Sequence, residues 1–256
     1  FGNKKYAYRV LMGDPLGSFY GYRYKGVYQN VEETYAVDKT GQQIMDINGA
    51  PVVVKNGDQK VYPGDAKYED VNGDGVIDEN DIVYLGNSNP TLTGGLNFTL
   101  GYKKLSLVAA LHGRAGQKVI NESRINMENM YGKNNQSVAV LRRWRSEGDN
   151  TDIPRALYDK GYNYLGSDRF VEDASFLRLK TITLKYQFPE NWMKPLGINK
   201  LEIYATGYDL FVWTKYTGQD PEINLKNPDG SAAQVAIDSN NTPKAMRFAF
   251  GLNLRF

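Results

Sequence analysis

The sequence predicts an all-β fold, and more specifically part of a transmembrane antiparallel up-and-down β-barrel with long extracellular loops. Three observations support this prediction. The last ten residues alternate strictly between apolar and polar or small side chains, two further alternating segments are joined by a very short connection, and long irregular stretches separate the strands. Because the same alternation can arise in a soluble sandwich, the prediction depends on which solvent the apolar faces meet.

The terminal segment, residues 247–256, shows the alternation most clearly. Side chains of a strand point to the two faces of a sheet in turn, so residues two apart share a face. In a membrane barrel the apolar face meets lipid and the polar face lines the lumen. In a sandwich the apolar face would instead cover the core. The apolar positions are Phe248, Phe250, Leu252, Leu254 and Phe256.

Two central segments are expected to form a hairpin. Residues 96–102 and 105–111 each alternate, and only Lys103 and Lys104 separate them. Two alternating runs with so short a joint are typical of a β-hairpin. The apolar faces of both runs carry no Lys or Arg, which agrees with a lipid-facing surface, since a cation at mid-depth costs about 2–4 kcal/mol.

Two more strands are expected before the terminal one. Residues 174–188 change the phase of their alternation near Lys180, which indicates a β-bulge or a rim segment that leaves the membrane. A turn is expected at 189–194, and residues 201–213 alternate again into an aromatic segment. The order of strand, tight turn, strand and long loop is typical of an up-and-down barrel.

The other segments lack sustained alternation. Residues 18–29 are expected to form a strand with four tyrosines on one face, and residues 30–64 an irregular excursion with a short strand at 52–54. Residues 113–168 and 214–243 are expected to be long loops, which usually carry function or bind a partner.

The composition limits the possible functions. A length of 256 residues suffices for one large domain, and a net charge of +2 gives no reason to expect a nucleic-acid partner. The absence of cysteine excludes a disulfide framework and thiol chemistry, and the single histidine, His112, argues against a His-rich metal site. The chain has no apolar run of the length that marks a membrane-spanning helix.

The segment 70–81 has the spacing of a twelve-residue calcium loop. Calcium needs several oxygens converging from one short segment, and Gly75 occupies the sixth position, where the sharp turn requires a residue without Cβ. Such an ion would be structural. The predicted metal ligands are Asp70, Asn72, Asp74, Val76 through its carbonyl, Asp78 and Asp81.

Two features depart from a helix-flanked calcium sensor. The twelfth position is Asp81 rather than a bidentate Glu, and the flanking residues 67–69 and 82–84 look extended rather than helical. The alternative is a loop rich in Asx turns that holds no ion.

No constellation of residues suggests an enzyme. His112 lies in the polar phase of its strand without a nucleophile beside it, and the neighbouring carboxylates Glu172 and Asp173 would point to opposite faces of a strand. We therefore expect no catalytic residues and no organic cofactor.

Several segments together resemble the C-terminal part of SusC/RagA-type TonB-dependent outer-membrane transporters of Bacteroidetes. They follow one another in the family's order across nearly all 256 residues. The segments are 17–29 (GSFYGYRYKGVYQ), 63–82 (PGDAKYEDVNGDGVIDENDI), 85–103 (LGNSNPTLTGGLNFTLGYK), 168–189 (DRFVEDASFLRLKTITLKYQFP), 208–223 (YDLFVWTKYTGQDPEI) and 247–256 (RFAFGLNLRF).

The resemblance implies that residues 1–256 are the C-terminal portion of a barrel of about 22 strands with a plug inside. It implies uptake of oligosaccharides or peptides in the outer membrane of a Gram-negative cell, coupling through TonB, and a SusD-like surface lipoprotein as a lid. The aromatic last residue, Phe256, matches the signal that the insertion machinery reads. The plug, the TonB-contacting segment and the early strands are not among these residues, so we expect a fragment or processed product. Its partners would be the rest of the same barrel, its plug and membrane lipid.

Two hypotheses follow. The first is a barrel segment of a nutrient importer, which performs transport without bond chemistry. The alternative is a soluble, calcium-stabilised β-sandwich that binds glycans. They differ in the surroundings of Phe250 and Leu252, which a second sheet would cover in the sandwich.

Overall fold

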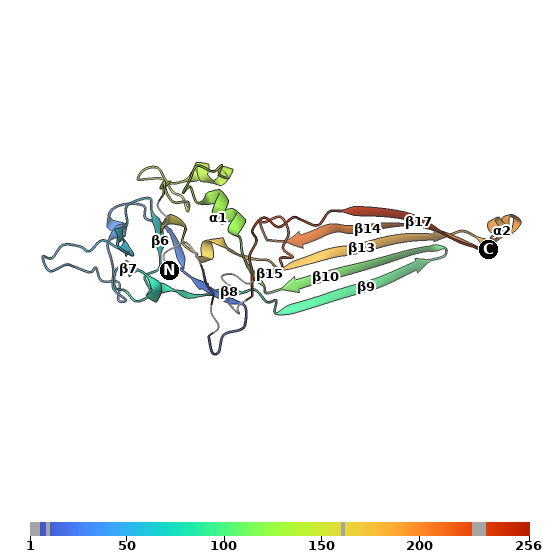
Figure 1. Ribbon diagram of the computed structural model, residues 1–256, viewed down its shortest axis with the longest axis horizontal. Coiled ribbons are helices and arrows are strands. Elements are labelled where there is room, and N and C mark those ends of the chain that lie inside the picture. The colour runs from blue at the N-terminus through green and yellow to red at the C-terminus, as the bar shows by residue number, and fades with distance from the viewer. Residues whose placement is uncertain (1–5, 9–10, 160–161, 227–233) are drawn as a thin grey trace. The chain divides into compact units, whose positions relative to one another are not determined.

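The computed structural model describes residues 1–256 with the exception of 1–5, 9–10, 160–161 and 227–233 (Figure 1). The chain forms two compact units, each assembled from segments that are distant in sequence. The sheet unit comprises Pro90–Gln117, Asp173–Glu222 and Asn241–Phe256, and the loop unit comprises the remaining segments, Phe1–Asn89, Lys118–Glu172 and Ile223–Asn240.

The sheet unit is built on one antiparallel sheet of five long strands (Figure 1). Chain order and spatial order agree, as in an up-and-down barrel: β9 pairs with β10, β10 with β13, β13 with β14 and β14 with β17. The two outer strands each have one described neighbour, so the sheet has two open edges. The strands are β9 (Leu92–Tyr102), β10 (Leu105–Ala115), β13 (Phe176–Gln187), β14 (Lys200–Thr214) and β17 (Arg247–Arg255).

The register places the predicted apolar positions on one face of this sheet. In one row across the sheet, Leu100 pairs with Leu107, Leu107 with Leu184, Leu184 with Ala205, and Ala205 with Phe250. Directly paired residues point to the same side, so the apolar alternation continues across the strands as one surface. The hairpin at Lys103–Lys104 is confirmed.

The β-bulge near Lys180 is also confirmed. Leu179 and Thr181 both have partners on the neighbouring strands, whereas the register skips Lys180 on both sides. An extra residue shifts the alternation by one position. This explains why Leu177 and Leu179 share a face with Ile182 and Leu184 although the sequence changes phase between them.

The apolar face is exposed. Phe250 is 80% and Leu252 58% exposed, and Leu96, Leu100, Phe248 and Leu254 on the same face are also exposed. A sandwich core would bury these side chains beneath a second sheet, so the soluble-sandwich alternative is wrong for this sheet. An exposed apolar face of this kind is what the wall of a transmembrane antiparallel β-barrel presents.

One connection differs from the expectation. Instead of a tight turn at 189–194, the chain from β13 to β14 forms the short helix α2 (Glu190–Met193) and the 3₁₀ turn η6 (Lys194–Leu196). Gly197, with φ of +69°, ends this structure, because glycine adopts the left-handed conformation without steric strain.

The loop unit consists of short elements around two small cores. The larger core contains Tyr22, Tyr28, Val61, Tyr68 and Leu165, and the smaller contains Tyr6, Phe19, Ile120 and Val235. Among the described residues, no helix is both long and apolar enough to cross a membrane.

The strands of the loop unit are β1 (Ala7–Tyr8), β2 (Ser18–Gly21), β3 (Tyr24–Val27), β4 (Lys55–Asn56), β5 (Gln59–Lys60), β6 (Ala66–Tyr68), β7 (Val76–Ile77), β8 (Val83–Asn87), β11 (Lys118–Ile120), β12 (Val171–Asp173), β15 (Leu225–Lys226) and β16 (Val235–Ala236). Its helical elements are α1 (Glu122–Glu128) and the 3₁₀ turns η1 (Glu32–Thr34), η2 (Glu79–Asp81), η3 (Val138–Arg142), η4 (Tyr162–Tyr164) and η5 (Asp168–Phe170).

The predicted strand at 18–29 is divided into β2 and β3, which belong to different sheets. Its tyrosines contribute to packing: Tyr20, Tyr22 and Tyr28 are buried, and Tyr22 and Tyr24 contact the ring of Tyr68.

The excursion at 30–64 contains an eight-residue repeat instead of the expected strand at 52–54. Ala36, Ile44 and Val52 lie eight residues apart and form a closed ring of backbone hydrogen bonds of 2.8–2.9 Å, in which each amide donates to the carbonyl of another member. A turn with a glycine of positive φ follows each member, at Gly41, Gly49 and Gly57. The repeat therefore folds as a triangular arrangement of three short turns.

Candidate functional site

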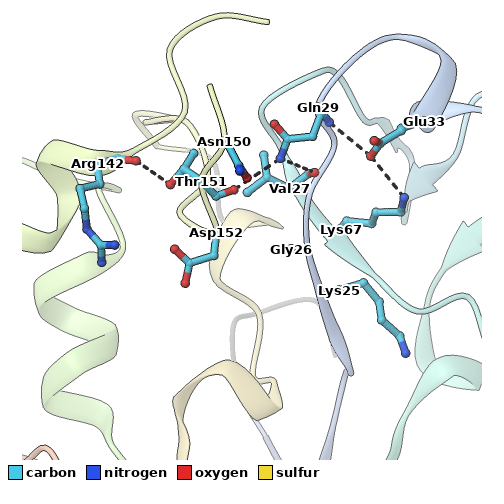
Figure 2. A pocket seen from close by; sticks show the side chains of 10 residues that line it. All are labelled: Lys25, Gly26, Val27, Gln29, Glu33, Lys67, Arg142, Asn150, Thr151 and Asp152. Carbon is cyan, nitrogen blue, oxygen red and sulfur yellow. Dashed lines mark hydrogen bonds and ion pairs between the residues drawn. The ribbon is translucent and has the colours of Figure 1, made fainter. Parts of the chain in front are cut away.

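A polar cavity of about 750 Å³ lies in the loop unit (Figure 2). Three chain segments line it: residues 25–33, which begin in β3 and end in η1, residue 67 in β6, and residues 142–152, which begin at the last residue of η3. Most of the lining side chains are charged or carry an amide. The lining residues are Lys25, Gly26, Val27, Gln29, Glu33, Lys67, Arg142, Asn150, Thr151 and Asp152.

Hydrogen bonds between distant segments hold the walls of this cavity together. The side-chain amide of Gln29 donates to the carbonyls of Val27 at 3.1 Å and Thr151 at 3.4 Å. The hydroxyl of Tyr24 donates to the carbonyl of Asp152 at 2.6 Å, and the hydroxyl of Thr151 donates to the carbonyl of Arg142 at 2.6 Å. The two sides of the cavity are thus fastened across more than a hundred residues of sequence.

Some of the charges in the cavity neutralise one another, and two do not. Lys67 pairs with Glu33 at 3.3 Å, and Lys25 pairs with Glu69 at 3.2 Å. Arg142 and Asp152 are exposed, and neither charged group has a hydrogen bond or ion pair to a described residue. The cavity therefore presents one free cation and one free carboxylate to solvent.

The first half of the acidic loop folds around the carboxylate of Asp70. Its two oxygens accept the backbone amides of Gly73 and Gly75, both at 2.7 Å. The side-chain amide of Asn72 donates to Asp74 at 2.8 Å, and the other oxygen of Asp74 accepts the amide of Val76, also at 2.8 Å. The spacing of these residues therefore produces a sharply wound loop.

The second half of the loop forms a capping box around η2. The carboxylate of Asp78 accepts the amide of Asn80 at 2.8 Å, and Asp81 accepts the amides of Asp78 and Val71, both at 2.8 Å. Asp81 is fully buried. Burial raises the pKa of Asp81 above its ordinary value, although the amide hydrogen bonds oppose this shift.

In the part of the chain that the structure describes, no three His, Cys, Asp or Glu side chains converge as a metal cluster. A carboxylate oxygen has two acceptor positions, so an oxygen that accepts one amide keeps a position for a cation, whereas Oδ1 of Asp70 and Oδ1 of Asp81 each accept two amides. The donor set of hard oxygens fits calcium in its chemistry. The flanks of the loop are extended, as β6 and β8, which confirms that the loop lacks the paired helices of a sensor.

The acidic loop packs closely on the eight-residue repeat. A Cβ at Gly75, whose φ is +81°, would lie 2.9 Å from the Cβ of Ala36, and a Cβ at Gly73 would lie 2.8 Å from the backbone nitrogen of Lys39. The amide of Lys55 also donates to the carbonyl of Gly75 at 3.0 Å. The two glycines thus permit a contact that holds the repeat against the loop.

A network of ion pairs lies on the polar face of the sheet unit, beside the β-bulge. Arg178, which is 3% exposed, donates to Asp220 at 2.5 Å. Lys180, the bulged residue, donates to Glu222 at 3.0 Å, and Lys244 also pairs with Glu222. The network joins β13 to both ends of the connection between β14 and β17.

The charge of Glu222 is strongly favoured. Burial alone would raise the pKa of this carboxyl, but hydrogen bonds from Lys244 and Lys180 outweigh burial and hold the pKa at about 2. Glu222 is therefore ionised throughout the physiological range.

Sequence reasoning identified the acidic loop but missed the cavity, the repeat and the ion-pair network. The repeat had a readable signal in the glycines eight residues apart. The cavity and the network join residues that are distant in sequence, so no local pattern marks them. The second predicted loop, 214–243, contains β15 and β16, and its residues 227–233 lie outside the described part of the chain.

The fold and the two faces of the sheet define the class of this protein as a membrane β-barrel, and comparisons with known proteins narrow the class. No family model matches the chain. It is 32% identical over 253 residues to one TonB-dependent receptor of Formosa agariphila and 30% identical over 249 residues to another, and these matches cover 97% and 95% of the chain. It is also 29% identical over 217 residues to the TonB-dependent receptor SusC of Bacteroides thetaiotaomicron, covering 84% of the chain.

The chain is similar in fold to the RagAB peptide importer, with a TM-score of 0.63 at 22% identity, over 96% of this chain and 24% of that one. Throughout most of its length the chain is therefore a SusC-type TonB-dependent receptor sequence. It spans about a fifth to a quarter of the length of the curated relatives that it matches.

Proposed function

We propose that this chain forms part of the wall of a TonB-dependent outer-membrane nutrient importer and contributes loops to the chamber that receives the solute. The observation that carries the proposal is the exposed apolar face that runs across all five strands of the sheet unit. Water-exposed sheets do not maintain so large an apolar surface, whereas lipid-facing walls require one.

The proposal includes the assembly around the chain. The open edges at β9 and β17 need partners, because unpaired strand edges are not tolerated in hydrocarbon. We infer that residues 1–256 are the C-terminal portion of the barrel, that other strands and a plug come from the rest of the same receptor, and that TonB supplies the energy coupling. A SusD-like lipoprotein is the proposed lid, and oligosaccharides or peptides are the proposed solutes. The mechanism is transport without bond chemistry.

The proposal is tested by fractionation and uptake with the full-length receptor. We expect the receptor to sediment with outer membranes and to be released only by detergent. Cells that carry it should accumulate fluorescent maltooligosaccharides or short peptides, and dissipation of the proton gradient should stop the accumulation. Release by buffer alone would contradict the membrane wall, and uptake that survives dissipation would contradict coupling through TonB.

We also propose that the acidic loop binds a structural calcium ion through Asp70, Asn72, Asp74, Asp78, Asp81 and the carbonyl of Val76. The support is the twelve-residue spacing, the glycine at the sixth position and the all-oxygen donor set. The affinity would lie in the range of extracellular modules, about 10⁻⁴–10⁻³ M. An ion there would stabilise the contact between the loop and the eight-residue repeat.

Calorimetry on the full-length receptor tests the calcium proposal. Calcium should release heat, and Asp74→Asn should weaken binding, because Asp74 is exposed and the change removes a negative charge from the donor set without opening the core. Asp58→Asn is the matched control, since Asp58 is an exposed carboxylate outside the loop. Absence of heat together with unchanged protease resistance in EGTA would leave the loop as Asx turns alone.

A further inference from the structure

The cavity of Figure 2 has the dimensions of a site for a small molecule. Its volume of about 750 Å³ lies within the range of about 300–1,000 Å³ that is usual for such sites. Its walls come from three segments of one compact unit, and cross-segment hydrogen bonds from Gln29 and Tyr24 fix them. A cavity held in this way is formed before any ligand arrives, so binding need not order the walls.

The lining selects the chemistry of the ligand. None of the ten lining residues is aromatic, so the cavity offers no stacking surface for a sugar ring. The charged groups that lack a partner are one guanidinium, at Arg142, and one carboxylate, at Asp152. In Figure 2 both side chains come from the same wall of the cavity and lie on the same side of Thr151.

A ligand with one kind of charge would satisfy only half of this pair. An anion would pair with Arg142 but approach the carboxylate of Asp152, and a neutral saccharide would leave both charges to compete with water. A zwitterion satisfies both groups, because a guanidinium binds a carboxylate through two parallel hydrogen bonds and a carboxylate binds an ammonium group. The side-chain amide of Asn150 and the carbonyl of Thr151 also line the cavity and can hydrogen-bond a peptide backbone.

We propose that this cavity binds a short peptide with free termini, with the peptide's carboxylate at Arg142 and its ammonium group at Asp152. The inference rests on the proposed import function only in naming a class of solute for it. Binding itself depends on the cavity of the loop unit and not on the barrel wall.

Calorimetry on the detergent-solubilised full-length receptor tests the proposal with trialanine as the probe. Trialanine should bind, whereas trialanine acetylated and amidated at its ends, and maltotriose, should bind at least about ten-fold more weakly. Arg142→Gln and Asp152→Asn should each weaken trialanine binding by about ten-fold or more. Arg145→Gln is the matched control, because Arg145 is an exposed arginine of the same segment outside the lining.

A charge exchange separates recognition from folding. Arg142→Glu and Asp152→Arg should each abolish binding of trialanine, and the double variant should restore it, because a zwitterion can bind in the reverse direction. Equal binding of blocked and free trialanine, or unchanged affinity in the single variants, would overturn the proposal.

The outcome for import is measured separately. If uptake persists in Arg142→Gln and Asp152→Asn, the import function is supported and this cavity is not required for it. Binding of trialanine without any energy-dependent uptake would keep the site and refute the import function.

Discussion

A charge placed on the apolar face of the sheet should impair barrel assembly far more than the same charge placed one residue away. Ile182 lies at the middle of β13, on the same face as Leu184, and pairs with Ala109 and Gly207 on the neighbouring strands. Ile182→Arg would put a guanidinium at the depth of the hydrocarbon centre, which costs about 2–4 kcal/mol. That cost corresponds to about a 30- to 700-fold change in the folding equilibrium.

Thr183→Arg is the matched control. Thr183 occupies the same strand but the opposite, polar face, where its hydroxyl shares a hydrogen bond of 2.9 Å with Thr206. Its replacement removes that bond, which is worth about 1 kcal/mol, and adds no charge to the lipid side. Denaturant titration of the full-length receptor in lipid vesicles would measure both free energies of unfolding. Equal losses for the two variants would refute the assignment of the faces.

Three further predictions concern the polar parts of the chain. Arg178→Met should leave the buried carboxylate of Asp220 without its ion-pair partner, at a cost of about 3–5 kcal/mol, and should speed protease cleavage in the connection between β14 and β17. The control Lys185→Met, on the same strand, should not change the rate of cleavage. Equal cleavage of the two variants would contradict the role of the ion-pair network. Because the folded pKa of Glu222, about 2, lies below the ordinary 4.5, its stabilisation is complete above about pH 4.5 and is lost as the pH falls toward 2. Protease resistance of the connection between β14 and β17 should therefore be constant from about pH 8 to 5 and decline below that, and Glu222→Gln should make this decline smaller. Gly75→Ala should destabilise the loop unit by about 1–3 kcal/mol, because the φ of Gly75 is +81° and the Cβ of Ala36 leaves no room for a side chain. Gly26→Ala is the control, since Gly26 also has a positive φ but has open space around it. A loss of thermal stability that is no larger for Gly75→Ala than for Gly26→Ala would argue against the close contact between Gly75 and Ala36.

The features that could be predicted from sequence are those encoded within a few neighbouring residues. The alternation of 247–256, the hairpin around Lys103 and the bulge at Lys180 each follow from the period of two in a strand. The register then follows from matching apolar faces, because a slip of one residue would turn every side chain to the wrong side.

The features that could not be predicted depend on contacts between residues that are far apart in the sequence. Arg178 and Asp220 are 42 residues apart, and Gln29 reaches Thr151 across 122 residues. No local pattern shows that these groups meet. The connection after β13 is helical rather than the expected turn, because a proline is compatible with the start of a helix, and α2 begins at the residue after Pro189.

The acidic loop lies between these two cases. Its spacing correctly indicated a tightly wound loop without flanking helices, since the ring of amides around Asp70 is a local structure. The burial of Asp81 and the contact of the loop with the eight-residue repeat could not be predicted from the sequence. The contact depends on where Ala36 and Lys39 lie in the folded unit.

The central claim is that lipid covers the apolar face of the sheet, and a spin-label scan of β17 tests it most directly. The 256 residues contain no cysteine, so single cysteines at positions 248 to 253 can be labelled selectively once any others in the full-length receptor are removed. In receptor reconstituted in vesicles, labels at 248, 250 and 252 should be accessible to oxygen dissolved in the bilayer, and labels at 249 and 253 to a water-soluble relaxing agent. Position 251 is omitted, because a Cβ there would lie 2.3 Å from the ring of Tyr204. Accessibility without this period of two, or even-numbered positions shielded from the bilayer, would contradict the account.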